Sequence, residues 1–307
     1  MRSKAVICCV LLMIIVLTGC NVSISINNDY ADIYAFVTAD GSEHSRLIYE
    51  GLKDAADDYT VNMEIIQIDL VNEQEDSIKL IKKAVRKSAK AIIITPSENH
   101  QLHSLLEKAH EKGIHLIYLD AASPLDIAGT YIYSDNEIAA EEAGHMLAEA
   151  MNNKGKAVML NISQDDPKAM DREKGFVKAM QDHPGISIIN IYNCNSSKEN
   201  AQKTLNDILA AYPDINGIFA ACPEIVSGAA AVLDQWDNEV KVVGFDCIDE
   251  SSDLIRTGRL YGYVTQNFYR IGYGAVEAAI QLGNGQTVPD RIDMGYELES
   301  VNNLSEK

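Results

Sequence analysis

Short apolar stretches alternate with amphipathic stretches of helical length along almost the whole chain of 307 residues. The apolar stretches are rich in β-branched residues and end at turn-forming residues, which predicts strands. The predicted strands are residues 31–37, 61–70, 91–95, 115–119, 130–133, 156–162, 186–192, 217–220, 240–245 and 260–265. The predicted helices are residues 43–59, 74–87, 97–112, 137–152, 167–182, 197–212, 223–236, 250–257 and 268–282.

Strict alternation of strands and helices predicts an α/β fold with parallel sheets, right-handed crossovers and helices on both faces. About ten strands are many for one twisted sheet, so we expect two similar doubly wound lobes, each with a mainly parallel five- to six-stranded sheet. The natural division falls at Ser134-Asp135-Asn136, after the fifth predicted strand. The absence of a Gly/Ser-rich linker there predicts lobes that are hinged by short segments.

The N-terminus has the features of a secretory signal. Arg2 and Lys4 precede an apolar stretch over residues 5–17, which is too short for a comfortable membrane span. The sequence Leu17-Thr18-Gly19-Cys20 resembles a bacterial lipobox, which implies a lipoprotein signal peptide over residues 1–19 and lipidation of Cys20. Residues 20–29 then form a polar tether, and the protein is extracytoplasmic and lipid-anchored to the cell membrane. An ordinary signal peptide is the alternative.

The composition restricts the partners. The chain has 45 acidic and 26 basic residues, a net charge of −19, which argues against nucleic acid and anionic membrane surfaces as partners. Beyond the signal and Cys20, three cysteines remain, namely Cys194, Cys222 and Cys247. An odd count cannot form a complete disulfide framework, so we expect reduced thiols. A soft-metal site is a further alternative.

Candidate chemistry lies just beyond the predicted strands. No hydrolase elbow, phosphate loop, zinc-protease helix or dinucleotide fingerprint occurs in the sequence. Polar residues instead follow several strands, at the edge where open α/β sheets bind ligands. They are Ser42, His44 and Ser45 in the first loop, Asp120, Cys222, Asp246 and Gln266 at later strand ends, and Arg172 early in the helix after the sixth strand.

These side chains suit a ligand that is covered in hydroxyls. Carboxylates accept hydrogen bonds from hydroxyls, Arg donates in a planar fork, and Gln does both. The pattern favours a binding site for a small sugar or polyol, with no cofactor and no metal. A glycosidase that uses Asp120 and Asp246 as acid and base is the enzymatic alternative, which we do not favour. His100, His103 and His110 recur at helical spacing, and we interpret them as a solvated helix face.

Several motifs in the chain match those of a known family. They are Leu119-Asp120, Ser134-Asp135-Asn136, Arg172 with Gly175-Phe176, Tyr212-Pro213-Asp214, Val242-Val243-Gly244-Phe245-Asp246, and Gly258-Arg259-Leu260 leading to Gln266. From residue 31 to about residue 299 the chain resembles periplasmic-binding-protein type sugar-binding lipoproteins, most of all ribose-binding proteins. In that family the positions that match Asp120, Arg172, Asp246 and Gln266 contact the sugar.

The resemblance implies the sheet order 2-1-3-4-5 in each lobe and three hinge crossings. The first lobe then comprises residues 30–134 and about 267–290, the second residues 135–266 and about 291–299, and residues 300–307 form a tail. A monomer is expected to close over its ligand and deliver it to the permease subunits of an ABC importer. The alternative partner is a membrane histidine kinase or chemoreceptor that senses the ligand.

The chain departs from the family at several ligand positions. Ala121 occupies a position where the family often has Arg, and Cys222 one where it has Asn. His44, Ser45, Asn195 and Ser196 fall where aromatic rings usually stack on the sugar. The departures predict a site with less apolar surface than usual for a sugar ring. The family order also makes strands eight and nine neighbours, which leaves a Cys222–Cys247 disulfide as an alternative to reduced thiols.

Overall fold

The computed structural model describes residues 32–68, 73–95, 100–120, 127–236, 238–246 and 251–303. The first part of the chain forms β1 (Ile33–Thr38), α2 (Glu43–Asp58), β2 (Met63–Ile68), α3 (Glu73–Arg86), β3 (Ala91–Ile94), α4 (His100–Glu111), β4 (His115–Leu119) and β5 (Thr130–Tyr133). It continues with α5 (Asn136–Ala150), β6 (Gly155–Asn161), α6 (Pro167–Gln181), β7 (Ile186–Asn193), α7 (Lys198–Ala211), β8 (Gly217–Ala220), α8 (Pro223–Leu233), β9 (Lys241–Phe245), α9 (Ser251–Arg256) and β10 (Gly262–Gln266). The last elements are α10 (Phe268–Gly283), β11 (Arg291–Asp293) and β12 (Tyr296–Ser300).

The strands form two six-stranded sheets of the same topology. One sheet has the order β11-β5-β4-β3-β1-β2 and the other has the order β12-β10-β9-β8-β6-β7. All pairings are parallel except the antiparallel pairing of β10 with β12. We call each sheet with its covering helices the first lobe and the second lobe. The predicted α/β class and the order 2-1-3-4-5 are confirmed in both lobes.

Two short strands were not predicted. β11 adds to the edge of the first sheet beside β5, and β12 adds to the edge of the second sheet beside β10. The prediction that residues 291–299 belong to the second lobe is therefore wrong for residues 291–293. Those three residues form β11, which pairs with Tyr131–Tyr133 of the first sheet. The chain crosses to the second lobe only after β11 and there forms β12.

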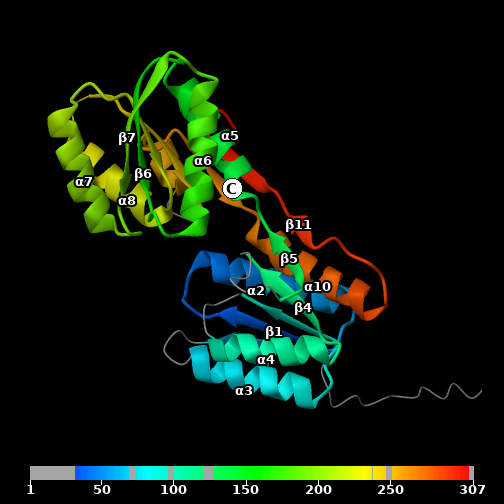
Figure 1. Cartoon of the computed structure of the whole chain (residues 1–307). Helices are drawn as coiled ribbons and strands as arrows, with labels where there is room; N and C mark the ends of the chain where they lie inside the picture. The colour runs from blue at the N-terminus through cyan, green and yellow to red at the C-terminus, as the bar shows by residue number, and fades with distance from the viewer. Residues whose placement is uncertain are drawn as a thin grey trace, which may run out of the picture. The chain divides into compact units, whose positions relative to one another are not determined.

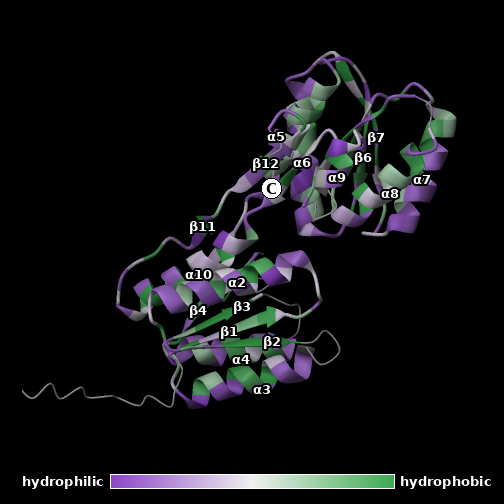
Figure 2. Ribbon diagram, turned by 180° about the vertical axis from the view of Figure 1, so that it is seen from behind, coloured by the Kyte–Doolittle hydropathy of each residue, from purple (hydrophilic) through white to green (hydrophobic). Residues whose placement is uncertain are grey.

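Each sheet is covered on both faces by helices. In the first lobe, α2 and α10 pack on one face and α3 and α4 on the other (Figure 1). In the second lobe, α5 and α6 cover one face, while α7, α8 and Ile255 of α9 cover the other. The strands β1 and β3 at the centre of the first sheet are hydrophobic, whereas the helices carry hydrophilic residues as well (Figure 2). The central strands are buried on both faces, which explains why their sequences are unbroken apolar runs.

One helix pair in each lobe packs closely through glycine. A Cβ atom on Gly272 of α10 would lie 2.1 Å from the main-chain oxygen of Ile48 in α2. A Cβ atom on Gly175 of α6 would lie 2.0 Å from the main-chain oxygen of Glu137 in α5. Both distances are far below van der Waals contact, so these helices can approach only because the glycines lack a side chain. Gly175 thereby fixes α6, and with it Arg172, against α5.

The chain crosses between the lobes three times, as predicted. The crossings follow β5, β10 and β11. Side chains near the crossings tie them together: the main-chain N–H of Asn267 donates to Oγ of Ser134, and that of Asp135 donates to Oδ1 of Asp293. No helix within the described ranges is long and apolar enough to cross a membrane. The signal peptide, Cys20 and the tether lie outside the described residues.

The interpretation of the α4 histidines as a solvated face is wrong for one of them. His100 and His110 are exposed, but His103 is buried and its ring meets that of His100 edge-on, with centroids 6.0 Å apart. His103 lies one turn after His100, on the side of α4 that faces the sheet with Leu102 and Leu106. No group of three or more His, Cys, Asp and Glu side chains suited to a metal occurs in the described part of the chain.

Candidate functional site

Asp120 and Asp246 occupy equivalent positions in the two lobes. Each follows the fourth strand of its lobe, β4 or β9, and each has a left-handed backbone with φ of +56° or +53°. The main-chain N–H of Asp120 donates to the oxygen of Ile132 in β5, and that of Asp246 to the oxygen of Val264 in β10, both at 2.8 Å. Asp is one of the few non-glycine residues that tolerate this conformation. The bend places each carboxylate at the carboxyl end of its sheet.

Arg172 is the centre of a buried polar cluster in the second lobe. Its Nη2 donates to Oδ2 of Asp246 at 2.6 Å, and its Nη1 donates to the main-chain oxygen of Ala221 at 2.5 Å. Its Nε donates to Oδ1 of Asn136 at 2.9 Å, and the guanidinium lies 3.8 Å from the ring centroid of Phe245. Arg172 is only 4% exposed. A buried cation is stable here because its donors are occupied by charge-assisted hydrogen bonds and its face by an aromatic ring.

Gln266 connects the two carboxylates. Its main-chain N–H donates to Oδ1 of Asp246 at 3.0 Å, and its Oε1 accepts from Nη2 of Arg172 at 3.4 Å. Its Nε2 donates across the lobes to Oδ1 of Asp120 at 3.2 Å. Asp120, Arg172, Asp246 and Gln266 therefore form one continuous network. That these four residues contact a ligand remains a prediction.

Three members of this environment were not among the predicted site residues. Lys168, in the first turn of α6, places its Nζ 2.5 Å from Oδ2 of Asp120. Lys168 lies four residues before Arg172, and this helical spacing could have indicated it. Asn136 belongs to a motif that matched the family, which was a second usable signal. Phe245 gave no signal of its own, because apolar residues are expected at the end of a buried strand.

The first turn of α2, where a loop was predicted, contributes His44 to the site. The His44 ring stacks on that of Phe268, with centroids 4.3 Å apart and an interplanar angle of 21°. Its Nε2 lies 3.4 Å from the main-chain oxygen of Asp246, so this first-lobe side chain reaches the buried cluster of the second lobe. Phe268 follows the β10 crossing, and its contact with His44 depends on tertiary structure that the sequence pattern does not reveal.

Ser42 and Ser45 have local roles in the structure. Ser42 is the N-cap of α2, and its Oγ accepts the main-chain N–H of Ser45 at 3.2 Å. Burial tends to raise the pKa of Asp40, but hydrogen bonds from Ser42 and Ser45 lower it more, so the pKa lies below its usual value. Both serines thus order the start of α2, which carries His44. Their predicted contact with a ligand stays a prediction.

Cys222 and Cys194 are buried free thiols. Cys222 is the N-cap residue of α8 but makes no side-chain capping bond, and it follows Ala221, whose oxygen binds Arg172. Burial raises the pKa of Cys222 to about 12 and also raises the pKa of Cys194. A protonated thiol is a poor metal ligand and nucleophile, so at neutral pH Cys222 is a weakly polar member of the hydrophobic core of the second lobe. Cys247 and Ala121 lie outside the described residues.

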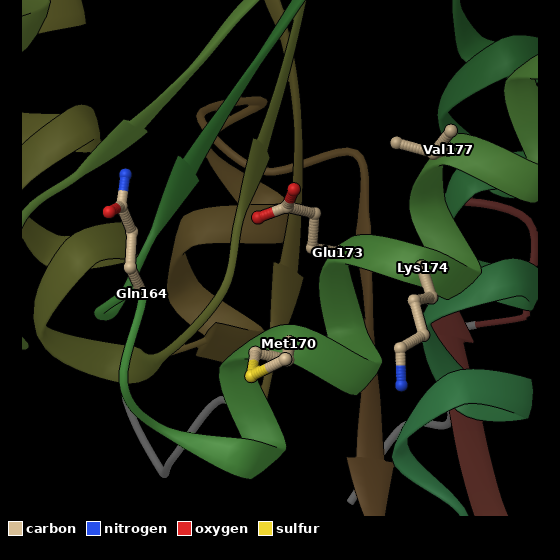
Figure 3. Close-up of a pocket in the computed structure, with 5 residues that line it drawn as sticks. All are labelled: Gln164, Met170, Glu173, Lys174 and Val177. Atoms are coloured by element: carbon tan, nitrogen blue, oxygen red, sulfur yellow. The ribbon is translucent and has the colours of Figure 1, made fainter.

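A pocket of about 450 Å³ lies elsewhere on α6, at residues Gln164, Met170, Glu173, Lys174 and Val177 (Figure 3). Four of these residues share one side of α6, and Gln164 comes from the loop after β6. Oε2 of Glu173 accepts a hydrogen bond from Nδ2 of Asn161. None of the predicted site residues lines this pocket, so it is separate from the polar network.

The sheet order and the three crossings agree with one known family. A family described as "Periplasmic binding protein domain" matches residues 33–287. The chain belongs to the periplasmic binding protein family. The family is one of binding proteins and not of enzymes, which confirms the prediction that this binding protein is not an enzyme.

Curated relatives and solved structures agree with this assignment. The ribose import binding protein of Haemophilus influenzae is 24% identical over 82% of this chain and 85% of its own. The D-apiose import binding protein of Paraburkholderia graminis is 28% identical over 70% of this chain and 69% of its own.

Among solved structures, a sugar-binding protein of a Bacillus halodurans sugar ABC transporter has a TM-score of 0.80 at 20% identity, covering 89% of this chain and 98% of its own. A periplasmic solute-binding protein of Actinobacillus succinogenes, solved with D-allose, has a TM-score of 0.76 at 23% identity, covering 88% of this chain and 97% of its own. At these identities the structures show the shared fold.

Proposed function

We propose that this binding protein captures a small neutral sugar or polyol outside the cytoplasm and delivers it to an ABC importer. The observation that carries the proposal is the network of Asp120, Arg172, Asp246 and Gln266. It combines two carboxylates, a guanidinium and an amide at the carboxyl ends of strands from both lobes. Ligands of open α/β sheets bind at this edge.

The network offers the hydrogen-bonding groups that a polyol needs. Carboxylate oxygens accept from hydroxyl hydrogens, while Gln266 and Lys168 donate to hydroxyl oxygens. A ligand between Asp120 and the second-lobe cluster exchanges the direct Gln266–Asp120 and Lys168–Asp120 contacts for contacts of its own. Because such contacts to both lobes exist together only in one arrangement of the lobes, the ligand stabilises that arrangement.

The relatives support the choice of ligand class and of transport. Curated relatives carry names of ribose and D-apiose import binding proteins, and one is named a xylitol-binding protein. Similar structures were solved with D-allose and with D-arabinose. All of these ligands are small, neutral and rich in hydroxyls. Import is preferred to sensing because the ribose and D-apiose relatives are named import binding proteins.

The proposed attachment to the membrane rests on the sequence of the N-terminus. Cleavage before Cys20 and lipidation of its thiol would leave residues 20–29 as a tether that spans at most about 35 Å. A tether of this length keeps the protein close to the membrane subunits of an importer. Mass spectrometry of the protein from its native host tests the proposed lipid attachment. A diacylglyceryl group on Cys20 is the expected result, and an unmodified mature N-terminus contradicts the anchor.

The contacts of the two carboxylates argue against the glycosidase alternative. Asp246 accepts from Gln266 on one oxygen and from Arg172 on the other. Asp120 accepts from Gln266 on one oxygen and from Lys168 on the other. A pair of catalytic carboxyl groups needs one member that holds a proton, whereas each of these carboxylates is paired with a cation.

A ligand screen on the mature protein tests the proposal. D-Ribose, D-apiose, D-allose, D-arabinose and xylitol are added separately, and the melting temperature and the heat of binding are measured. A true ligand raises the melting temperature in proportion to the logarithm of its concentration. Asp246→Asn keeps the shape of the side chain, and we expect it to remove this rise. Failure of every sugar and polyol to bind, or unchanged binding by Asp246→Asn, contradicts the proposal.

A further inference from the structure

Lys168 occupies a position that is unfavourable for a cation in a helix. α6 begins with the N-cap Asp166 and Pro167, so Lys168 lies in the first turn. The first turn carries the positive end of the helix dipole, which disfavours a positive side chain. Main-chain capping does not need the Lys168 side chain, because the N-cap accepts the main-chain N–H of Lys168. Its ammonium group instead extends to Asp120 of the other lobe.

The contact of Lys168 with Asp120 makes the polar network electrically neutral. Oδ2 of Asp120 contacts Lys168 and Oδ1 contacts Gln266, which in turn contacts Asp246 and Arg172. The connected network contains two cations, Lys168 and Arg172, and two anions, Asp120 and Asp246. Arg172 and Asp246 are both buried, whereas the Lys168 side chain is 35% exposed and that of Asp120 is 15% exposed. The Lys168–Asp120 pair is therefore the part of the network that an entering ligand can reach and rearrange.

We propose that Lys168 is a ligand-contacting residue that makes this site select neutral polyols over charged sugars. The inference rests on the proposed function and adds the residue that sets the charge selectivity. With Lys168 present the network is neutral, so an amino sugar or a sugar acid loses its hydration without gaining a net opposite charge. Without Lys168 the network carries one surplus negative charge beside Asp120, and this charge attracts a cationic ligand and repels an anionic one.

Another lysine on the same helix offers a matched control. Lys174 lies six residues further along α6 and pairs with Asp171, and both of these side chains are exposed. Substitution of Lys174 changes the net charge of the protein by the same amount as substitution of Lys168. It does not alter the network around Asp120. A change in binding that occurs in the Lys168 variant and not in the Lys174 variant therefore reflects the local contact of Lys168, and not the net charge of the protein or the helix propensity of lysine.

The experiment compares the mature wild-type protein with Lys168→Met, Lys168→Arg and Lys174→Met. Titration calorimetry measures the binding of D-ribose, 2-amino-2-deoxy-D-ribose and D-ribonate, and of D-allose, D-allosamine and D-allonate. Circular dichroism and thermal melts check that each variant is folded. For the wild type and for Lys174→Met we expect the neutral sugar to bind at least about tenfold more tightly than its charged derivatives, roughly the difference that 1.4 kcal/mol produces.

Lys168→Met should weaken binding of the neutral sugar by about tenfold and shift the ratio of amino-sugar to neutral-sugar affinity by about tenfold toward the amine. Lys168→Arg should keep most of the preference for the neutral sugar, because arginine has the same positive charge as lysine. An unchanged affinity ratio in Lys168→Met overturns the inference while the proposed function stands. Equal shifts in Lys174→Met also overturn it. Failure of the wild type to bind any of the six compounds overturns both the inference and the choice of ligand class.

Discussion

The two lobes contribute to the candidate site in different ways. In the second lobe, Arg172, Asp246 and Gln266 are 3–4% exposed and bind one another. In the first lobe, Asp120 and His44 are partly exposed, and their cluster contacts come from the second lobe. The second lobe therefore carries a preformed half of the site. The first lobe carries a half whose contacts depend on how the lobes meet.

This difference separates stability from binding. A buried ion pair is costly to break because the remaining charge loses both its partner and its hydration. A partly exposed pair recovers much of the loss by contact with water. Substitutions in the second-lobe half should thus affect folding and binding together, whereas those in the first-lobe half should affect mainly binding.

The largest effect is expected for Arg172→Met. It leaves the Asp246 carboxylate buried without its cation, so we expect the free energy of unfolding to fall by about 3–5 kcal/mol. Urea denaturation followed by circular dichroism measures the change. The double variant Arg172→Met/Asp246→Leu removes both charges and should recover part of the loss. A decrease below about 1 kcal/mol in the single variant would show that the cluster is not the rigid half of the site.

The close helix pairs allow a matched test of position. Gly175→Ala forces α6 away from α5, and Gly51→Ala forces α2 away from Tyr269 of α10, with a Cβ distance of 2.0 Å to a main-chain oxygen in each case. Each variant should lose about 1–3 kcal/mol of stability from overpacking. Gly175→Ala should weaken sugar binding in calorimetry more than Gly51→Ala, because α6 carries both Arg172 and Lys168, whereas α2 carries His44. Equal losses of sugar affinity in the two variants would contradict the prediction that the α5–α6 pair contributes more to binding than the α2–α10 pair.

The buried thiol of the second lobe predicts a loss of stability in alkali. Because burial raises the pKa of Cys222 to about 12 from an ordinary value of 9.0, its contribution is complete below pH 9. Between pH 9 and 12 the unfolded chain releases this proton and the folded chain keeps it, so stability falls as the pH rises. The contribution lost by pH 10 is about 1 kcal/mol. Urea denaturation at pH 8, 9 and 10 should show a smaller decline for Cys222→Ala than for the wild type, and equal slopes would contradict the shift.

The smallest effect on stability is expected for Asp120→Asn. The amide fits the same partly exposed position, so the free energy of unfolding should change by less than about 1 kcal/mol. Binding of a neutral sugar should nevertheless weaken by about tenfold, because the amide is a weaker acceptor than the carboxylate. Thermal melts with and without the sugar distinguish the two effects. A stability loss as large as that of Arg172→Met would remove the contrast between the lobes.

Most of the fold was predictable because strands that are buried on both faces give clear apolar runs. All ten predicted strands occur, most with boundaries shifted by one or two residues. β11 and β12 were missed because three and five residues at sheet edges, with partly exposed side chains, give no such run. Their places follow from the second and third crossings of the chain between the sheets, which are a tertiary property.

The candidate site was predictable where chain position alone places a side chain. Asp120 and Asp246 follow strands and Gln266 is the last residue of one, so the parallel topology brings them to the carboxyl ends of the sheets. Phe268 was missed because its partner, His44, lies far away in the sequence, and Lys168 was missed because its helical spacing from Arg172 was not used. The burial of Asp246 was also not apparent from the sequence. For this reason Asp246→Ala, which leaves Arg172 buried and unpaired, is a less specific probe of binding than Asp246→Asn.

The left-handed backbone at Asp120 and Asp246 also bears on how such a protein can diverge. Asn enters this conformation as readily as Asp, whereas most other residues are strained in it. At each of these positions an acid can therefore become an amide, and a hydrogen-bond acceptor can become a donor as well, without a change in the course of the chain. Substitutions at these two positions can thus change the preferred solute in small steps, while the main chain of the binding protein stays the same.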